Sequence, residues 1–312
     1  MYTIKEAAAR SGVTVPLLRA WERRYKVVAP ARTASGYRLY DDAALTRLRT
    51  MRRLVDEGWS PSNAAAAVLE DRAPVVAIPA SLEADLPGAV PAGDMETAAD
   101  HIERFVDAAG RLDVAAIENV LDAMFAEGTF ETVADRYLMP SLVALGEAWA
   151  AGRIDVAAEH AASHAVHRRL SAAFQAAGDA GGDHGVLVGL PPGARHELGA
   201  LAFGVAARRA GLAILYLGPD LPVADWVATA RRVGARAAVI GAPTPRDGRA
   251  ALDVAASLRA DDAGLVIAIG GLAAAAAVAG VRDWDGTRPV RLPQGSRAAV
   301  AALTDALRDG GQ

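Results

Sequence analysis

The strongest constraint on the fold of this chain is a set of short apolar runs in its C-terminal part. Each run is followed by a longer amphipathic segment, and the runs lie at 185–190, 213–217, 237–241 and 265–269. Strands that alternate with helices predict a doubly wound parallel sheet, because two parallel neighbours need a crossover connection between them. We therefore expect an α/β domain of the flavodoxin-like or Rossmann type over 184–310. Ligands of such domains bind at the carboxyl ends of the strands.

Proline-rich and glycine-rich segments mark the other domain boundaries. Four prolines fall between 71 and 94, and we expect an extended linker at 73–96. The glycine-rich stretch 178–183 ends the region that follows. Between these segments apolar residues recur at three and four positions, which predicts an all-α four-helix bundle over 97–178.

The composition removes several classes of protein. Apolar residues make up 52% of the chain, which is enough to bury a core in each domain. The chain has no cysteine, so disulfides, thiolate zinc sites and cysteine nucleophiles are excluded. A metal would have to be held by histidine, by carboxylates or within a prebuilt cofactor. No charge-free apolar stretch reaches the roughly 18 residues of a membrane span. We expect a soluble protein of the cytoplasm, associated with the nucleoid and not with a membrane.

Charge is divided unevenly along the chain. Residues 1–60 carry twelve Lys and Arg against six Asp and Glu, whereas the remainder carries 21 against 31. A compact cationic segment on an anionic body is typical of a DNA-binding module joined to a regulatory domain.

The first 40 residues have the pattern of a winged helix–turn–helix. A helix is expected over 4–10, a turn over 11–13, and a second helix that Thr14 caps and Pro16 enters in its first turn. A glycine turn within 32–40, followed by aromatic and branched residues, predicts a short β wing. Trp21 is expected in the core. The side chains expected to contact DNA are Arg19, Arg23, Arg24, Tyr25, Arg32, Tyr37 and Arg38. A winged helix that binds protein instead of DNA is the alternative.

Residues 2–70 resemble the MerR family of regulators. The matching stretches lie at 2–8, 15–22 and 36–40 and occur in the family's order. The resemblance implies a dimeric activator or repressor that binds double-stranded operator DNA, with RNA polymerase as a candidate partner. The long dimerisation helix and the metal-binding cysteines of the metal-sensing members are absent, so the effector must be sensed elsewhere. The expected fold class is therefore multidomain: a winged helix–turn–helix over 1–72, then the all-α bundle, then the α/β sheet.

Two motifs in the body have the residue types of a ligand site. Val156, Glu159 and His160 are spaced to share one face of a helix and could line a pocket with Trp149. A structural or surface role is the simpler alternative, and a zinc site formed by His160, His164 and His167 is another. The second motif is the loop 191–199 directly after the first strand, which contains His196. A neutral imidazole there could bind a cobalt-like ion, although a capping or core role is the default for one loop histidine.

The order of these elements resembles the helical cap and Rossmann-type fold of cobalamin-binding proteins over about 98–310. Trp149, Val156, Glu159 and His160 match the Trp-x6-Val-x2-Glu-His signature of the CarH/LitR photoreceptors, which also carry a MerR head. The resemblance implies that His196 is the lower axial cobalt ligand and that the benzimidazole tail lies near Gly270 and Gly271. It also implies further contacts from Gly199 and Thr244.

In that family the signature residues surround the adenosyl group of adenosylcobalamin (coenzyme B12), and His160 would bind the cobalt of the corrin after light. Two positions depart from the wider cobalamin pattern. Ala194 stands where an aspartate usually orients the ligating histidine, and Ala242 stands where a serine is common. We expect Glu197 or a backbone carbonyl to take the place of that aspartate.

The function expected from these features is a light-dependent transcriptional regulator, a repressor rather than an enzyme. By the resemblance, it binds operator DNA in the dark as an adenosylcobalamin-bound homotetramer and dissociates after photolysis of the cobalt–carbon bond. One alternative is a MerR regulator that senses cobalamin or another tetrapyrrole without light. The other is a corrinoid-dependent methyl carrier, against which the DNA-binding head and the lack of a catalytic acid–base pair both argue.

Overall fold

The computed structural model describes residues 1–32, 38–56, 65, 68–69, 92–178, 185–280 and 288–309. The chain forms two compact units, Met1–Ala77 and Ile78–Gln312. The boundary between the units falls within the stretch expected as a linker.

The N-terminal unit has the elements of a winged helix–turn–helix. In chain order these are β1 (Tyr2–Thr3), α1 (Ile4–Ser11), α2 (Val15–Tyr25), β2 (Ala31–Arg32), β3 (Arg38–Tyr40) and α3 (Asp42–Asp56). The strands form an antiparallel sheet in the order β1-β3-β2. Thr14 caps α2 by accepting a hydrogen bond from the Leu17 amide, as predicted. Trp21 is 2% exposed in the core of this unit, which confirms its expected place.

The second unit begins with a helical bundle. Its elements are α5 (Ala92–Gly110), α6 (Val114–Ala126), α7 (Phe130–Val133), the π-helical turn η2 (Ala134–Leu138), α8 (Met139–Ala150) and α9 (Val156–Ala176). Because α7, η2 and α8 follow one another without a break, the bundle has four helical segments. Pro140 lies in the first turn of α8. It has no amide hydrogen to continue the ladder from the preceding turn, which fits the π-helical widening there.

The start of α5 corrects the predicted linker. Residues 92–96 were assigned to the linker, but the helix begins at Ala92. The preceding Pro91 suits a helix start, and Met95 and Glu96 are good helix formers. The predicted linker extends too far, because the prolines before residue 92 were the only signal used to place its end.

The remainder of the second unit is a parallel sheet in the order β5-β4-β6-β7-β8. The strands are β4 (Val186–Gly189), β5 (Ile214–Gly218), β6 (Ala237–Gly241), β7 (Val266–Gly270) and β8 (Val290–Arg291). The first four match the predicted runs to within a residue or two. The short β8 was not predicted, because its two residues form no apolar run.

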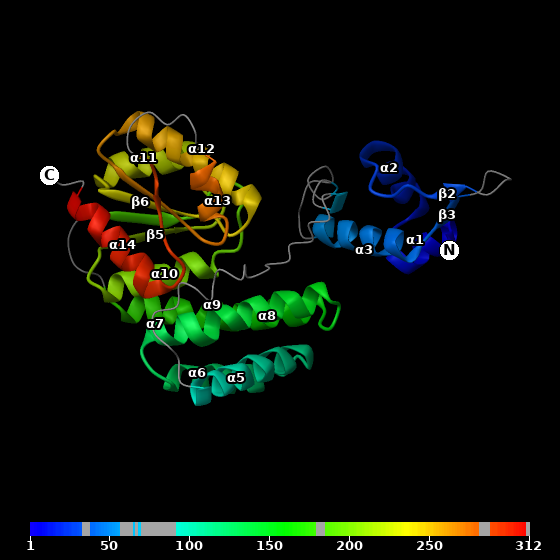
Figure 1. The fold of residues 1–312 in the computed structure, drawn as a ribbon, viewed down its shortest axis with the longest axis horizontal. Helices are drawn as coiled ribbons and strands as arrows, with labels where there is room; N and C mark the ends of the chain where they lie inside the picture. Colours follow the sequence, from blue (N-terminus) through cyan, green and yellow to red (C-terminus); the bar gives the residue numbers. More distant parts are fainter. Residues whose placement is uncertain are drawn as a thin grey trace. The chain divides into compact units, whose positions relative to one another are not determined.

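Helices cover both faces of this sheet (Figure 1). On one face lie α11 (Val223–Val233), α12 (Pro245–Asp261) and α13 (Ala274–Ala279). On the other lie α10 (Leu198–Arg209) and α14 (Ser296–Asp309), with the bundle packed beyond them. Alternate strand residues serve the two faces: Val186 and Val188 join the core shared with the bundle, whereas Leu187 joins the core under α11 and α12.

Polar contacts also hold the bundle to the sheet layer. The Asp135 carboxylate in η2 accepts hydrogen bonds from the Ser296 amide and hydroxyl, each 2.8 Å from its Oδ1, and so caps α14 from another layer. Glu131 Oε1 accepts a 2.8 Å hydrogen bond from Arg209 Nε of α10. These contacts and the shared core hold the bundle against the sheet layer. Some of the candidate site residues lie in the bundle and the others in the sheet layer.

Candidate functional site

The loop that carries His196 leaves the carboxyl end of β4 and leads into α10. The Asp220 carboxylate accepts a 2.6 Å hydrogen bond from the Gly193 amide, and the Asp220 amide donates to the Ala194 carbonyl oxygen at 3.0 Å. Ala194 is 1% exposed, so the loop is anchored to the sheet just before the histidine. His196 itself is exposed. An anchored loop with an exposed imidazole at this edge of a parallel sheet can present a nitrogen ligand to a bound group.

Thr244 is already engaged within the protein. It caps α12: its hydroxyl donates to Asp247 Oδ2 at 2.6 Å and accepts from the Asp247 amide at 3.3 Å. The family resemblance implies a contact from Thr244 to the cofactor. The hydroxyl proton is used by Asp247, so a ligand could use only the remaining acceptor capacity of the oxygen.

Gly270 ends β7 at the same edge and Gly271 follows it, and Gly271 must be a glycine. Its φ is +101°, a region that other residues rarely adopt, and a Cβ there would lie 2.7 Å from the Ala242 carbonyl oxygen. The turn after β7 therefore packs against the turn after β6. Gly199, in contrast, would place a Cβ in open space.

Gly271→Ala is expected to lower the free energy of unfolding by about 1–3 kcal/mol, because the strained conformation and the contact with Ala242 cannot both be relieved. Gly199→Ala is the matched control. It replaces a helical glycine with nothing nearby and should leave stability unchanged or raise it by up to about 1 kcal/mol. Urea unfolding of both variants measures the difference. Equal stability of the two variants would contradict this account of the turn.

Three of the signature residues lie at the start of α9 and the fourth near the end of α8. Trp149 is half-buried and packs against the bundle core, whereas the side chain of Val156 is 42% exposed. Glu159 Oε2 lies 2.6 Å from His160 Nδ1, and Glu159 Oε1 accepts a 2.6 Å hydrogen bond from the Ser163 hydroxyl. The His160 side chain is 63% exposed. Glu159 therefore holds an accessible imidazole by one of its two nitrogens.

Helix α9 joins this cluster to the His196 loop. His167, on the same helical face as His160, has its Nε2 3.4 Å from Oε1 of Glu197, the residue next to His196. His160 lies seven residues earlier on the helix, about 10 Å along its axis at 1.5 Å per residue. Glu197, the neighbour of one predicted ligand histidine, thus contacts the helix that carries the other.

The zinc alternative is not supported. The His160 and His164 rings have centroids 6.5 Å apart, and His167 faces Glu197. Across 92–178 and the other described ranges, no three His, Asp or Glu side chains are grouped so that they could hold a metal ion.

Tyr216 is a residue of this region that the sequence analysis missed. It lies on β5, next to Val188 of β4, and its hydroxyl donates a 2.7 Å hydrogen bond to Glu197 Oε2. Burial and this hydrogen bond raise the pKa of Tyr216 above its usual value. Glu197 was expected as an orienting partner for the His196 imidazole, but its carboxylate faces Tyr216 and His167 instead. The contact between Tyr216 and Glu197 depends on the strand order, which places β5 beside β4. The sequence alone does not give that order.

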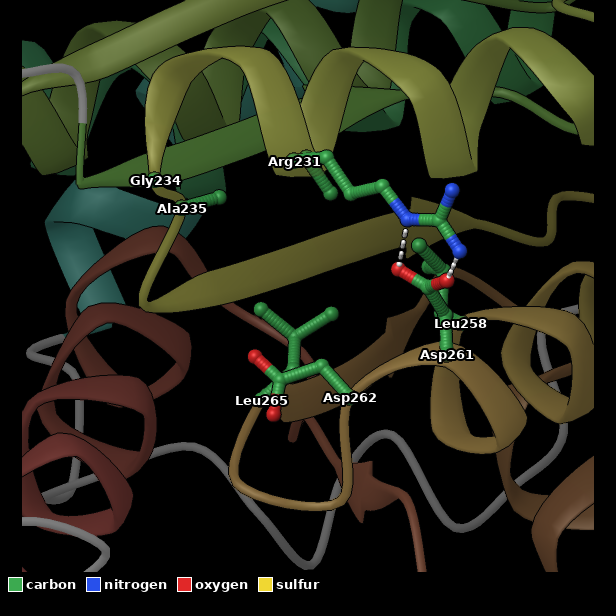
Figure 2. A pocket seen from close by; sticks show the side chains of 8 residues that line it. Arg231, Gly234, Ala235, Leu258, Asp261, Asp262 and Leu265 are labelled. Carbon is green, nitrogen blue, oxygen red and sulfur yellow. Dashed lines mark hydrogen bonds and ion pairs between the residues drawn. The ribbon is translucent and has the colours of Figure 1, made fainter.

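A separate hollow of about 200 Å³ lies at the opposite edge of the sheet, beside the amino ends of β6 and β7 (Figure 2). Arg231 of α11 and Asp261 of α12 form an ion pair across it, with Arg231 Nε 2.8 Å from Asp261 Oδ2. Because parallel sheets bind ligands at their carboxyl ends, this hollow is not part of the candidate site.

The N-terminal unit exposes several of the predicted cations on α2. Arg19, Arg23 and Arg24 are exposed, and the Arg24 guanidinium lies 5.6 Å from the centre of the Tyr25 ring. The Arg32 side chain and Tyr37 lie outside the described residues.

Arg38, which we predict to contact DNA, also has a partner within the protein. Its Nε donates a 2.9 Å hydrogen bond to Glu22 Oε1 of α2, which raises the pKa of the Arg38 guanidinium. The Tyr40 hydroxyl donates to the other oxygen of Glu22 at 3.0 Å. Glu22 thus ties the wing strand to the helix that carries the exposed arginines. The pattern of cations in the sequence did not reveal this internal partner.

Salt dependence should separate Arg38 from the exposed arginines. Arg19→Ala is expected to weaken DNA binding and to reduce the slope of log affinity against log salt by about one, as for a lost phosphate contact. Arg38→Ala should weaken binding with the slope unchanged, because it loosens the wing without removing a phosphate contact. Fluorescence anisotropy across a salt series measures both slopes. A reduced slope for Arg38→Ala would show that it contacts phosphate directly.

Comparisons with known proteins agree with the N-terminal unit and with the helical bundle. Residues 2–70 match the model of the MerR HTH family regulatory proteins, and residues 101–173 match that of the B12 binding domain. The HTH-type transcriptional repressor CarH of Myxococcus xanthus is 32% identical over 228 residues, which span 72% of this chain and 73% of that protein. The chain belongs to the CarH type of B12-binding MerR regulators.

Other known proteins are similar to this CarH-type regulator over part of its length. The HTH-type transcriptional repressor CarA of Myxococcus xanthus is 30% identical, over 71% of this chain and 69% of that protein. The HTH-type transcriptional regulator MlrA of Escherichia coli is 43% identical over 58 residues, 19% of this chain and 24% of its own. Among solved structures, the Methanosarcina barkeri monomethylamine corrinoid protein superposes with a TM-score of 0.48 at 17% identity, covering 68% of this chain and 99% of that one.

The predicted family, multidomain fold class and DNA-binding role are therefore confirmed, and the chain is a transcription regulator rather than an enzyme. The residues at the carboxyl edge fit a corrinoid, since an exposed imidazole on an anchored loop is suitable chemistry for cobalt and Gly199 leaves space beside it. Within the described parts of the chain, no helix is long and apolar enough to cross a membrane.

Proposed function

We propose that this CarH-type regulator is a light-dependent repressor. In the dark it binds adenosylcobalamin and holds operator DNA as a tetramer, and illumination dissociates the tetramer and releases the DNA. The observation that carries the proposal is the arrangement along α9. The helix carries the Glu159–His160 pair near one end and contacts Glu197, the residue next to His196, through His167, which supports a site with one imidazole from each element.

The chain's own residues would hold and orient the cofactor. His196 would ligate from the sheet side, and Gly199, Gly270 and Gly271 would leave space for the ring and tail. Trp149 and Val156 would pack against the adenosyl group on the bundle side. When bound, adenosylcobalamin supplies a cobalt–carbon bond that visible light breaks.

Glu159 has a holding role in this proposal. Its carboxylate fixes Nδ1 of His160 and is itself fixed by Ser163, so His160 Nε2 would remain available as a ligand. A ligand nitrogen whose partner ring nitrogen is bonded to a carboxylate is more basic and better oriented. His160 would therefore be ready to bind once the adenosyl group has left.

Assembly would convert this local change into a change in DNA binding. A tetramer presents several heads to one operator, and linked binding can raise affinity by a factor of about 10² or more without any new contact. Losing the tetramer would remove that gain and expose the promoter to RNA polymerase.

A gel shift on operator DNA tests the proposal, with apoprotein, cobalamin-loaded protein in the dark and the same sample after illumination. The proposal predicts tight binding only for the dark, loaded sample. Binding that depends on cobalamin but not on light would identify a cobalamin sensor without a light response. Equal binding in all three samples would remove any cobalamin control.

A further inference from the structure

Glu197 lies where three structural elements meet. It follows His196 directly and precedes α10. One carboxylate oxygen accepts the 2.7 Å hydrogen bond from Tyr216 of β5, and the other lies 3.4 Å from His167 Nε2 of α9. The side chain is 21% exposed. This single carboxylate therefore connects the His196 loop to the sheet on one side and to the bundle on the other.

The partners of Glu197 are themselves fixed by a packed seam. His167 Nδ1 and the Ser171 hydroxyl share a 3.4 Å hydrogen bond. The Tyr216 ring packs against Phe174 of α9, with ring centroids 5.9 Å apart, and the Arg208 guanidinium of α10 lies 3.7 Å from the centre of the Phe174 ring. Moving the Glu197 carboxylate would therefore break its contacts with α9 and β5.

The loop is consequently held at two points close to the histidine. Asp220 holds it at Gly193 and Ala194, and Tyr216 and His167 hold it at Glu197. Only Arg195 and His196 lie between these points, and the Glu197 amide closes the span by donating to the Arg195 carbonyl oxygen at 3.0 Å. A span of two residues between fixed ends leaves the His196 backbone little freedom.

We propose that Glu197 is a positioning residue that fixes His196 relative to α9, and so sets the spacing between His196 and His160. The inference rests on the proposed role of the two histidines as cobalt ligands. With Ala194 in place of an acidic partner, orientation comes through the loop backbone and not through a carboxylate on the imidazole. Because α9 carries His160 and also contacts Glu197, a shift of this helix is transmitted to both sides of the cofactor site.

The test uses the full-length protein titrated with adenosylcobalamin, with the absorption spectrum as the readout of histidine ligation. Glu197→Ala removes the carboxylate, and Tyr216→Phe removes only the hydroxyl that holds it. Both variants should bind adenosylcobalamin about 10-fold more weakly, the low end of the cost of losing a residue that orients a metal ligand, and should shift the spectrum toward that of cobalamin without a histidine ligand. Glu197→Gln keeps an oxygen that can accept from Tyr216, so it should restore most of the affinity.

Glu131→Ala is the matched control. Glu131 also joins the bundle to the sheet layer, through Arg209, but lies away from the loop. This variant should lose thermal stability as Glu197→Ala does, while its affinity and spectrum stay as in the wild type. A spectral shift in Glu131→Ala as large as in Glu197→Ala would reduce Glu197 to a general stabiliser and overturn the inference.

Two further outcomes separate this inference from the proposed function. Wild-type spectra for Glu197→Ala and Tyr216→Phe, alongside a shifted spectrum for His196→Ala, would overturn the positioning role and leave the ligand assignment standing. Failure of the wild-type protein to bind adenosylcobalamin would overturn both.

Discussion

His196→Ala is expected to lower the affinity of the protein for adenosylcobalamin by about 100-fold. Losing a residue that orients a metal ligand typically costs about 10- to 100-fold in affinity, and losing the ligand itself should reach the upper end of that range. The His196 imidazole is exposed on a loop that is anchored on both sides, so removing it should leave the fold intact. Equilibrium dialysis with the cofactor in the dark gives the two dissociation constants.

His164→Ala provides the control for this measurement. His164 is exposed on the same helix as His160 but has no expected contact with cobalt, so its removal should leave affinity and spectrum unchanged. Equal affinity of His196→Ala and the wild type, with the same absorption spectrum, would show that the lower ligand is not His196.

Illumination of the cofactor-loaded protein is expected to weaken operator binding by about 10²-fold. The affinity falls because the tetramer dissociates and its DNA-binding units are no longer linked. No residue of the N-terminal unit needs to change its contacts with DNA. The effect should be larger at physiological salt than at low salt, because a smaller species neutralises fewer phosphates. Anisotropy titrations on labelled operator, before and after light, measure it.

His160→Ala separates dark assembly from the response to light. The variant should bind the cofactor and the operator in the dark like the wild type, since His160 is held by Glu159 and is not expected to touch cobalt at that stage. After illumination its spectrum should lack the signature of cobalt with two histidine ligands. A His160→Ala protein that fails to bind operator in the dark would contradict this division of roles.

The fold was largely predictable because its main elements have strong local signals. Strands β4, β6 and β7 are continuous apolar runs, as expected of strands buried on both faces, and Thr14 and Pro16 mark the start of α2. The strand β8 has two residues, and its place beside β7 depends on tertiary contacts. Such an element leaves no periodic pattern to detect.

The chemistry of the site was predictable in residue type but not in partners. The spacing of Val156, Glu159 and His160 predicts a common helical face, and the three residues lie in the first turns of α9. Arg38 was identified as a cation, but its pairing with Glu22 joins residues far apart in sequence. Glu197 likewise contacts Tyr216 of the sheet and His167 of the bundle, neither of which is near it in sequence. Partners of this kind follow from the packing of elements, which a single sequence does not specify.

The most direct test of the account is the mass of the purified protein in solution, measured by light scattering with adenosylcobalamin in the dark and again after illumination. The account predicts a tetramer in the dark that becomes a smaller species in the light, with the apoprotein also smaller than a tetramer. A mass that stays the same in all three samples would contradict the claim that cobalamin controls this regulator through its assembly.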